Sequence, residues 1–156
     1  MTPQRVPKSA VLAMHEMLLA EHGGSPGILS EAGLEAALAS PRNHLAHANP
    51  DLFDLAAQYA SAITRSHPFK DGNKRVALTV AGVFLEMNGL RLEAPERDAV
   101  NAMLALSTRE LDESAFAEWL RMNSTKLPRQ KRAPVRRKAP PHRRSHTPKR
   151  PRRPGR

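Results

Sequence analysis

Basic residues and prolines are concentrated at the C-terminal end of this 156-residue chain, and this limits how much of it can fold. Residues 124–156 hold 14 of the 25 lysines and arginines, 7 of the 14 prolines and none of the 15 acidic residues. One leucine and one valine are the only large apolar residues there, so this segment cannot bury enough surface to offset the entropy lost on ordering. We predict one folded domain over residues 1–123 and a disordered tail over residues 124–156.

The domain and the tail differ in charge. Residues 1–123 carry 25 − 14 = 11 basic and 15 acidic residues, a net charge of −4, although the whole chain has a formal charge of +10. The chain has no cysteine, which excludes a disulfide framework and a thiolate metal site. The apolar stretch Ala10–Ala20 is interrupted by His15 and Glu16, which argues against a signal peptide or a membrane span. We therefore expect a cytoplasmic protein.

Apolar residues recur at helical spacing through the domain, and capping residues and helix breakers separate the runs. Six segments are predicted to be helical: one from Ser9 to Gly23, one from Ser30 to Pro41, one from Asn49 or Asp51 to Pro68, one from Gly72 or Asn73 to Asn88, one that begins at Pro95 and one capped by Asp112. The fourth is apolar on nearly every side, so we expect it to be the central buried helix. Short β pairing near Arg91–Glu93 is considered, but the predicted fold class is all-α, a small bundle of about six helices.

The motif His67-Pro-Phe-Lys-Asp-Gly-Asn-Lys-Arg75 carries the chemistry of this chain. It places cations at the predicted start of the fourth helix, where unpaired backbone N–H groups and the helix dipole favour an anion. A bound phosphate would relieve the repulsion between Lys74, Arg75 and that dipole. Gly72 allows a sharp turn and a close approach of the backbone to a ligand. The motif therefore predicts a site for a nucleotide phosphate.

Three further residues of the motif fit the same interpretation. Asn73 can cap the turn or donate to a phosphate. Asp71 offers the oxygen ligands that Mg²⁺ prefers, and histidine is the residue most often used as a general base, which suits His67 for attack by a hydroxyl. Each residue alone has an ordinary structural explanation, and the functional interpretation depends on their combination.

The motif resembles the signature of the Fic/Doc family, and specifically of its Doc (death-on-curing) branch. Fic proteins read His-x-Phe-x-Asp/Glu-Gly-Asn-Gly-Arg-x-x-Arg, whereas the Doc branch has lysine at the position of Lys74. Further similarity lies in the segments 23–27, 51–57 and 83–89, and the resemblance covers about residues 8–123. It implies a small α-helical bundle, in agreement with the periodicity.

The resemblance also implies a role for individual residues. They are His67 as the catalytic base, Asp71 as the Mg²⁺ ligand, Gly72, Asn73 and Lys74 as the anion-binding turn, Arg75 as the phosphate-contacting arginine and Arg65 as a further basic residue of the nucleotide site. The implied cofactors are ATP and Mg²⁺. Leu78 stands where Fic proteins have a second arginine, and this departure and Lys74 both argue against the AMP-transfer geometry of Fic proteins.

Three functions follow from the resemblance and from the tail. Doc-like members are implied to be kinases that phosphorylate a threonine of elongation factor Tu, block translation and pair with a small antitoxin. A Fic-type transferase would instead attach AMP to a protein hydroxyl. The third hypothesis is a catalytically silent core with a nucleic-acid-binding tail.

Two other regions have open interpretations. The basic tail could contact nucleic acid through phosphate neutralisation, could bring the protein to the ribosome or another location, or could have no function. His44 and His47 are predicted to lie in the loop between the second and third helices. They could contact the target there, or simply be solvated.

Overall fold

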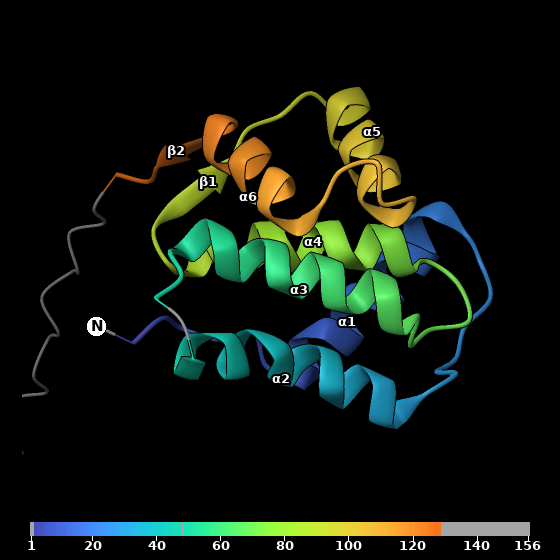
Figure 1. Ribbon diagram of the computed structural model, residues 1–156. Coiled ribbons are helices and arrows are strands. Elements are labelled where there is room, and N and C mark those ends of the chain that lie inside the picture. Colours follow the sequence, from blue (N-terminus) through green and yellow to red (C-terminus); the bar gives the residue numbers. More distant parts are fainter. Residues whose placement is uncertain (1, 48, 129–156) are drawn as a thin grey trace, which may run out of the picture.

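The computed structural model of the chain describes residues 2–47 and 49–128, so most of the predicted disordered tail lies outside the described residues. The elements in chain order are α1 (Lys8–His22), α2 (Glu31–His47), α3 (Leu52–Ser66), α4 (Asn73–Met87), β1 (Leu90–Leu92), α5 (Glu96–Ser107), α6 (Glu113–Met122) and β2 (Ser124–Lys126) (Figure 1). The predicted helical fold with about six helices is confirmed for this part of the chain. No helix in it is both long and apolar enough to cross a membrane.

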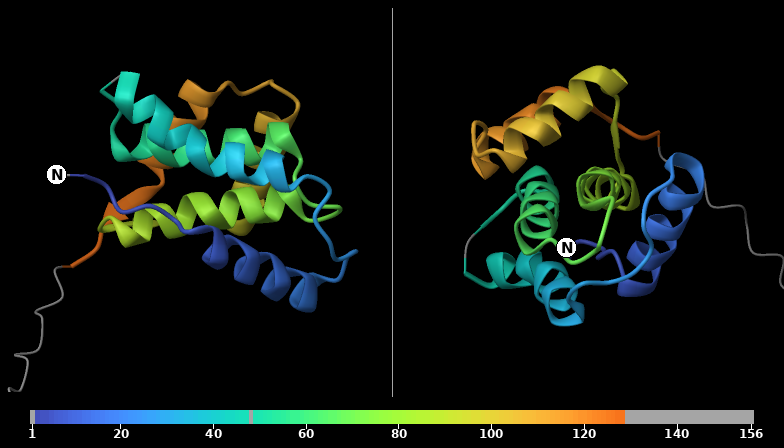
Figure 2. Two further views of the ribbon diagram at one scale, coloured as in Figure 1. Left: turned by 90° about the horizontal axis from the view of Figure 1, so that it is seen from below. Right: turned by 90° about the vertical axis from the view of Figure 1, so that its right-hand side faces the viewer.

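Helices α3 and α4 form the centre of the bundle. In the right-hand view of Figure 2, α4 is seen end-on, with the other helices arranged around it. The core residues that are most completely buried come mainly from this pair: Tyr59, Ile63, Val76, Val80, Phe84 and Leu85, joined by Phe69, Phe116 and Leu120. Small residues on α3, such as Ala56 and Ala60, are also fully buried, and a surface of alanines allows helices to approach closely.

Several helix ends lie where the sequence predicts them. Asp51 caps α3 through a reciprocal capping box with Asp54, with the side chain of each residue accepting from the backbone N–H of the other, at 2.8 and 3.0 Å. Asp112 caps α6 by accepting from the backbone N–H of Ala115 at 2.7 Å. Helix α3 ends one residue before His67, as expected for the segment that precedes Pro68. Side-chain oxygens at these positions satisfy N–H groups that the helix itself leaves unpaired.

Two predicted helix ends are wrong. Helix α1 begins at Lys8, and the carbonyl of Pro7, not the side chain of Ser9, accepts from the first-turn N–H groups. Helix α2 continues through Pro41 to His47. Pro41 is buried beside a small cavity that Leu55 and Tyr59 of α3 also line, and we attribute the continuation of the helix to this packing, which offsets the missing backbone N–H.

The short β pairing considered near Arg91–Glu93 is present. Strand β1 pairs antiparallel with β2, with Leu90 opposite Lys126 and Leu92 opposite Ser124. The N–H of Leu127 also donates to the carbonyl of Gly89 at 2.9 Å. Residues 124–127 are therefore attached to the domain, at the end of α4 opposite the signature motif (Figure 1), and the predicted start of the disordered tail at residue 124 is wrong for them.

Candidate active site

The signature motif forms the loop between α3 and α4 and the first turn of α4. His67 follows the last residue of α3, with left-handed backbone angles (φ 46°, ψ 56°), and its N–H donates to the carbonyl of Ile63 at 3.1 Å. This conformation is uncommon for a residue with a side chain. Pro68 and Phe69 are buried, whereas the His67 side chain is exposed. The backbone thus directs His67 outward while the next two residues anchor the loop.

An open pocket of about 560 Å³ lies over this loop, and we call it the signature pocket. The predicted site residues that line it are His67, Asp71, Gly72, Asn73, Lys74 and Arg75. Thr64, Lys70 and Ser107 complete the lining. The structure therefore brings together all the predicted site residues except Arg65.

Asn73 holds the loop in place from within. It is buried, its Oδ1 accepts from the N–H of Phe69 at 3.0 Å, and its Nδ2 donates to the carbonyl of Phe69 at 2.9 Å. Phe69 in turn stacks on His15, with ring centroids 3.9 Å apart. Since its side chain is engaged inside the protein, Asn73 acts as the cap of the turn, the first of the two roles considered for it.

Asp71 is positioned by a segment that the motif does not include. Its Oδ2 accepts from the N–H of Ser25 at 3.2 Å, and its carbonyl accepts a hydrogen bond from Nε2 of the buried His15 at 2.9 Å. A Cβ atom at Gly24 would lie only 2.7 Å from Asp71 Oδ2. The glycine at this position therefore leaves room for the carboxylate. Further along the same loop, the carbonyl of Gly27 accepts from the N–H of Lys70.

The first turn of α4 has the features of an anion site. Gly72 adopts a left-handed conformation (φ 80°) before Asn73, and no acidic residue lies in the first turn. The backbone N–H groups of a first helical turn lack partners within the helix. In the part of the chain that the structure describes, no acidic side chain forms an ion pair with Lys70, Lys74 or Arg75. The pocket thus combines positive charge, free donors and an exposed imidazole.

The arrangement of Asp71 fits a magnesium ion bound together with a nucleotide. Asp71 Oδ1 accepts from the N–H of Gly72 at 2.8 Å and Oδ2 accepts from Ser25, which leaves further lone pairs on both oxygens. No group of three or more potential ligands gathers within residues 2–47 and 49–128. Mg²⁺ commonly binds through one or two carboxylates plus substrate phosphates, so a single carboxylate beside a phosphate site is an adequate protein contribution.

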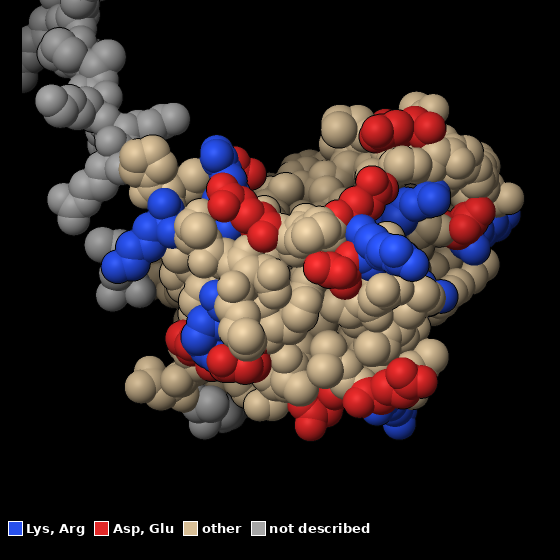
Figure 3. Space-filling view, turned by 90° about the horizontal axis from the view of Figure 1, so that it is seen from above, with Lys and Arg blue, Asp and Glu red and all other residues tan. Residues whose placement is uncertain are grey.

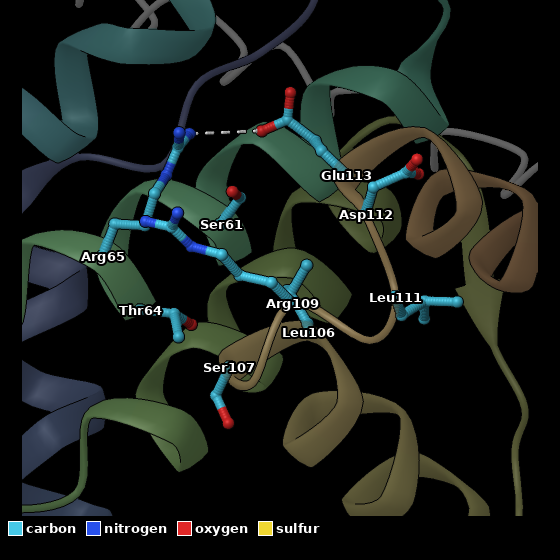
Figure 4. Close-up of a pocket in the computed structure, with 9 residues that line it drawn as sticks. All are labelled: Ser61, Thr64, Arg65, Leu106, Ser107, Arg109, Leu111, Asp112 and Glu113. Atoms are coloured by element: carbon cyan, nitrogen blue, oxygen red, sulfur yellow. Dashed lines mark ion pairs between the residues drawn. The ribbon is translucent and has the colours of Figure 1, made fainter.

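Arg65 does not line the signature pocket. It lies in an adjacent pocket of about 570 Å³ together with Ser61 and Arg109, and its Nη2 is 3.6 Å from Oε1 of Glu113 (Figure 4). Thr64 and Ser107 line both pockets, so the two are continuous. The predicted contact of Arg65 with the nucleotide would require the ligand to extend into this second pocket. Leu78 lines neither of these pockets and instead lies in an apolar hollow between α4 and α5, which Lys74 and Arg75 also line.

The predicted loop containing His44 and His47 is instead the last part of α2, because the helix continues past Pro41. His44 borders a pocket with Asn49 and Asp54 at the start of α3, whereas His67 follows the end of that 15-residue helix. At 1.5 Å per residue the two histidines stand about 20 Å apart along α3. His44 is therefore not a member of the signature pocket, and the side chain of His47 is outside the described residues.

Sequence reasoning missed Thr64, Lys70, Ser107 and the position of Gly24 beside the Asp71 carboxylate. Lys70 lies inside the motif, and the glycine-rich run at residues 23–27 was the visible signal for the second loop. Nothing local marks Thr64 or Ser107, since their approach depends on how α5 packs beside α3.

Comparison with known proteins gives a consistent result. The model of the Fic/DOC family matches residues 5–85. The protein described as "Protein kinase doc" of Escherichia phage P1 is 33% identical over 113 residues, which cover 71% of this chain and 88% of the relative. "Toxin Doc" of Mycolicibacterium smegmatis is 35% identical over 100 residues, covering 61% of this chain and 76% of the relative. With these matches and with a helical bundle that carries the signature loop, the chain belongs to the Fic/DOC family.

Proposed function

We propose that this chain is a Doc-like toxin of a toxin–antitoxin pair, an ATP-dependent phosphotransferase that phosphorylates a protein hydroxyl and so blocks translation. The expected target is a threonine of elongation factor Tu, and the expected partner is a small antitoxin. The observation that carries the proposal is the signature pocket, in which exposed His67 stands beside the N-terminus of α4 and the cations Lys70, Lys74 and Arg75. The names of the two relatives, a protein kinase and a toxin, support it.

In this proposal the first turn of α4 binds the phosphates of ATP, and the acceptor hydroxyl lies at His67. His67 removes the hydroxyl proton as the oxygen attacks the γ-phosphorus. The bond from that phosphorus to its bridging oxygen breaks, and ADP leaves. Phosphoryl transfer depends mostly on positioning and charge neutralisation, which Lys74 and Arg75 supply here. When bound at Asp71, Mg²⁺ would neutralise further charge on the phosphate oxygens.

The position of the radioactive label distinguishes phosphate transfer from AMP transfer. The full chain is incubated with elongation factor Tu and with ATP labelled at either the γ- or the α-phosphate. Label from the γ-position supports the proposal, label from the α-position supports an AMP transferase, and no label on any protein supports a catalytically silent core. Lys74 and Leu78, which replace residues of the Fic pattern, favour the first outcome.

Replacement of His67 tests the role of the imidazole. His67→Ala should reduce γ-phosphate transfer by about 10²- to 10⁴-fold, the usual contribution of a general base. The thermal midpoint should not fall, because the side chain is exposed. His22→Ala, on the exposed end of α1, is the matched control and should transfer at the wild-type rate. Unchanged γ-labelling by His67→Ala would falsify the mechanism.

Truncation separates the enzyme from the tail. The cut is best made after Pro128, since Ser124–Lys126 form β2 and a shorter chain would lose this strand. A chain of residues 1–128 should keep its transfer activity. If the tail contacts nucleic acid or the ribosome through its charge, the shortened chain should lose binding that weakens steeply with salt.

A further inference from the structure

The pocket that contains Arg65 differs in charge from the signature pocket, and we call it the arginine pocket. Its charged residues are Arg65 and Arg109 balanced by Asp112 and Glu113. The signature pocket instead has Lys70, Lys74 and Arg75 against Asp71. Figure 3 shows basic and acidic side chains side by side on the face that carries α5 and α6. An excess of cations suits the concentrated charge of a triphosphate, whereas a balanced polar lining suits a polypeptide with donors, acceptors and single charges.

Arg109 is the cation of the arginine pocket that has no acidic partner. Arg65 is paired with Glu113, and Asp112 is engaged as the cap of α6. No acidic side chain in the described part of the chain pairs with Arg109, and residues 129–156 contain none. Figure 4 shows Arg109 reaching from the loop between α5 and α6 across the pocket toward α3. Its guanidinium is therefore available to an external anion.

The loop that presents Arg109 is hydrogen-bonded to the last turn of α5. Arg109 has a left-handed backbone (φ 64°), one of two such residues other than glycine among those described, His67 being the other. Its N–H donates to the carbonyl of Leu106 at 3.3 Å, and the N–H of Leu111 donates to the carbonyl of Ala105 at 3.1 Å. A side chain in this conformation costs about 1–2 kcal/mol relative to glycine. An arginine in this disfavoured backbone conformation at the edge of a pocket is consistent with a binding role.

We propose that the arginine pocket binds the target polypeptide next to its acceptor hydroxyl, with Arg109 pairing with the carboxylate of an Asp or Glu side chain. The placement of the hydroxyl at His67 rests on the function proposed above. Thr64, which lines both pockets, lies one helical turn before His67, a rise of about 5 Å. An extended chain advances about 3.3 Å per residue. Because the two pockets adjoin over so short a rise, one extended peptide of several residues can place its threonine at His67 and a nearby acidic side chain at Arg109.

Peptide binding tests this inference without requiring catalysis. Fluorescent nine-residue peptides with a central threonine carry Asp, Lys or Ala at each other position in turn, and their binding to the full chain is measured by anisotropy without nucleotide. Wild-type protein should favour Asp over Ala at one position near the threonine by about fivefold, the effect of a partly exposed ion pair. Arg109→Glu should abolish this preference or transfer it to Lys.

Two variants exclude indirect effects. Arg97→Glu, a charge reversal at an exposed site on α5, should keep the preference for Asp. Arg109→Gly, which suits the left-handed backbone, should lose the preference without a lower thermal midpoint. The inference is overturned if no peptide binds, if wild-type protein shows no preference for Asp, or if the preference survives Arg109→Glu.

Transfer kinetics distinguish a carboxylate of the target from a phosphate of the nucleotide as the anion at Arg109. With γ-labelled ATP and a preferred peptide, Arg109→Glu should raise the KM for the peptide and leave kcat and the KM for ATP unchanged. A raised KM for ATP would assign Arg109 to the nucleotide and overturn the inference. If wild-type protein transfers no phosphate, the proposed function fails, whereas the binding experiment still decides the role of Arg109.

Discussion

The two ends of α4 are each held by an asparagine whose side-chain amide bonds to both backbone groups of another residue, four positions away at one end and 84 at the other. At the N-terminal end, Asn73 bonds to both the N–H and the carbonyl of Phe69. At the C-terminal end, Asn88 accepts from the N–H of Gln4 at 2.8 Å and donates to the carbonyl of Gln4 at 3.0 Å. In each case the side-chain amide accepts one hydrogen bond and donates another, as the backbone of a neighbouring β-strand would do.

The two ends of α4 differ in the charge that lies beside these asparagines. The segment after Asn88 continues into β1, whose backbone pairs with β2, so the chain itself satisfies these polar groups. Beside Asn73, by contrast, cations without acidic partners face the open signature pocket. Both ends of α4 are thus held by an asparagine, and only the unbalanced positive charge at the N-terminal end indicates a ligand.

The largest difference between the two ends should follow from removing that charge. In the double variant Lys74→Ala with Arg75→Ala, phosphate transfer should fall by at least about 100-fold, since a charge-assisted hydrogen bond contributes about 1.5–3 kcal/mol. The free energy of unfolding should not decrease, because both side chains are exposed at the positive end of a helix. Arg91→Ala, at the other end of α4, should change neither quantity. Equal losses of activity from both ends would contradict the comparison.

Replacement of the two asparagines should separate stability from activity. Asn73→Ala and Asn88→Ala should each lower the free energy of unfolding by about 1–3 kcal/mol, because backbone groups lose their partners. Urea denaturation measures this loss. Only Asn73→Ala should also reduce the rate of transfer at saturating ATP, since it releases the loop between His67 and Asp71. A comparable drop in rate for Asn88→Ala would mean that both ends serve the site.

Two adjacent glycines test how Asp71 is positioned. A Cβ atom at Gly24 would overlap Asp71 Oδ2, whereas one at Gly23 would meet no atom within 4 Å. Both residues have positive φ, so the backbone strain of a replacement is present in both variants. Gly24→Ala should raise the Mg²⁺ concentration for half-maximal transfer by about tenfold, the lower range of effects seen when support of a metal ligand is lost. The proposed role of Asp71 is wrong if Gly23→Ala has the same effect.

The smallest effect is expected at Asp51, far from the signature pocket. Burial raises the pKa of this carboxyl, but the N–H of Asp54 and the Arg121 guanidinium outweigh that effect and hold the pKa below its ordinary value of 3.8. The stabilisation is therefore present above pH 3.8 and is lost as the pH falls through the lower pKa of the folded state. Asp51→Ala should cost about 1 kcal/mol at pH 7 and progressively less below pH 3.8. Urea denaturation at pH 7 and at a pH below 3.8 measures the cost of the replacement, and an equal cost under the two conditions would contradict the prediction.

Local patterns predicted those features that depend on neighbours in sequence. The caps at Asp51 and Asp112 and the end of α3 before Pro68 follow from residue types within one turn of the helix. The composition of the signature motif was sufficient to predict six of the residues that line the signature pocket, because these six lie close together in the chain, but it did not predict Lys70, Thr64 or Ser107.

Contacts between distant segments were not predictable in the same way. The pairing of β1 with β2 joins residues more than 30 positions apart, and no short pattern marks the partner of Arg91. Pro41 has the sequence signal of a helix end, and only its burial against α3 explains the continuation of α2. For the same reason Arg65, two residues from His67 in sequence, points into a different pocket.

At position 67 the histidine that the proposed activity requires is less stable in the left-handed backbone conformation than a glycine would be. Glycine adopts this conformation without the penalty of about 1–2 kcal/mol that a Cβ atom incurs. The greater entropy of an unfolded chain that contains glycine offsets part of this gain in stability. His67→Gly would therefore remove the proposed base and still leave a protein at least as stable as the wild type, as thermal denaturation would show. Cells that escape the proposed toxin by this replacement would accumulate a well-folded, inactive protein able to occupy the antitoxin.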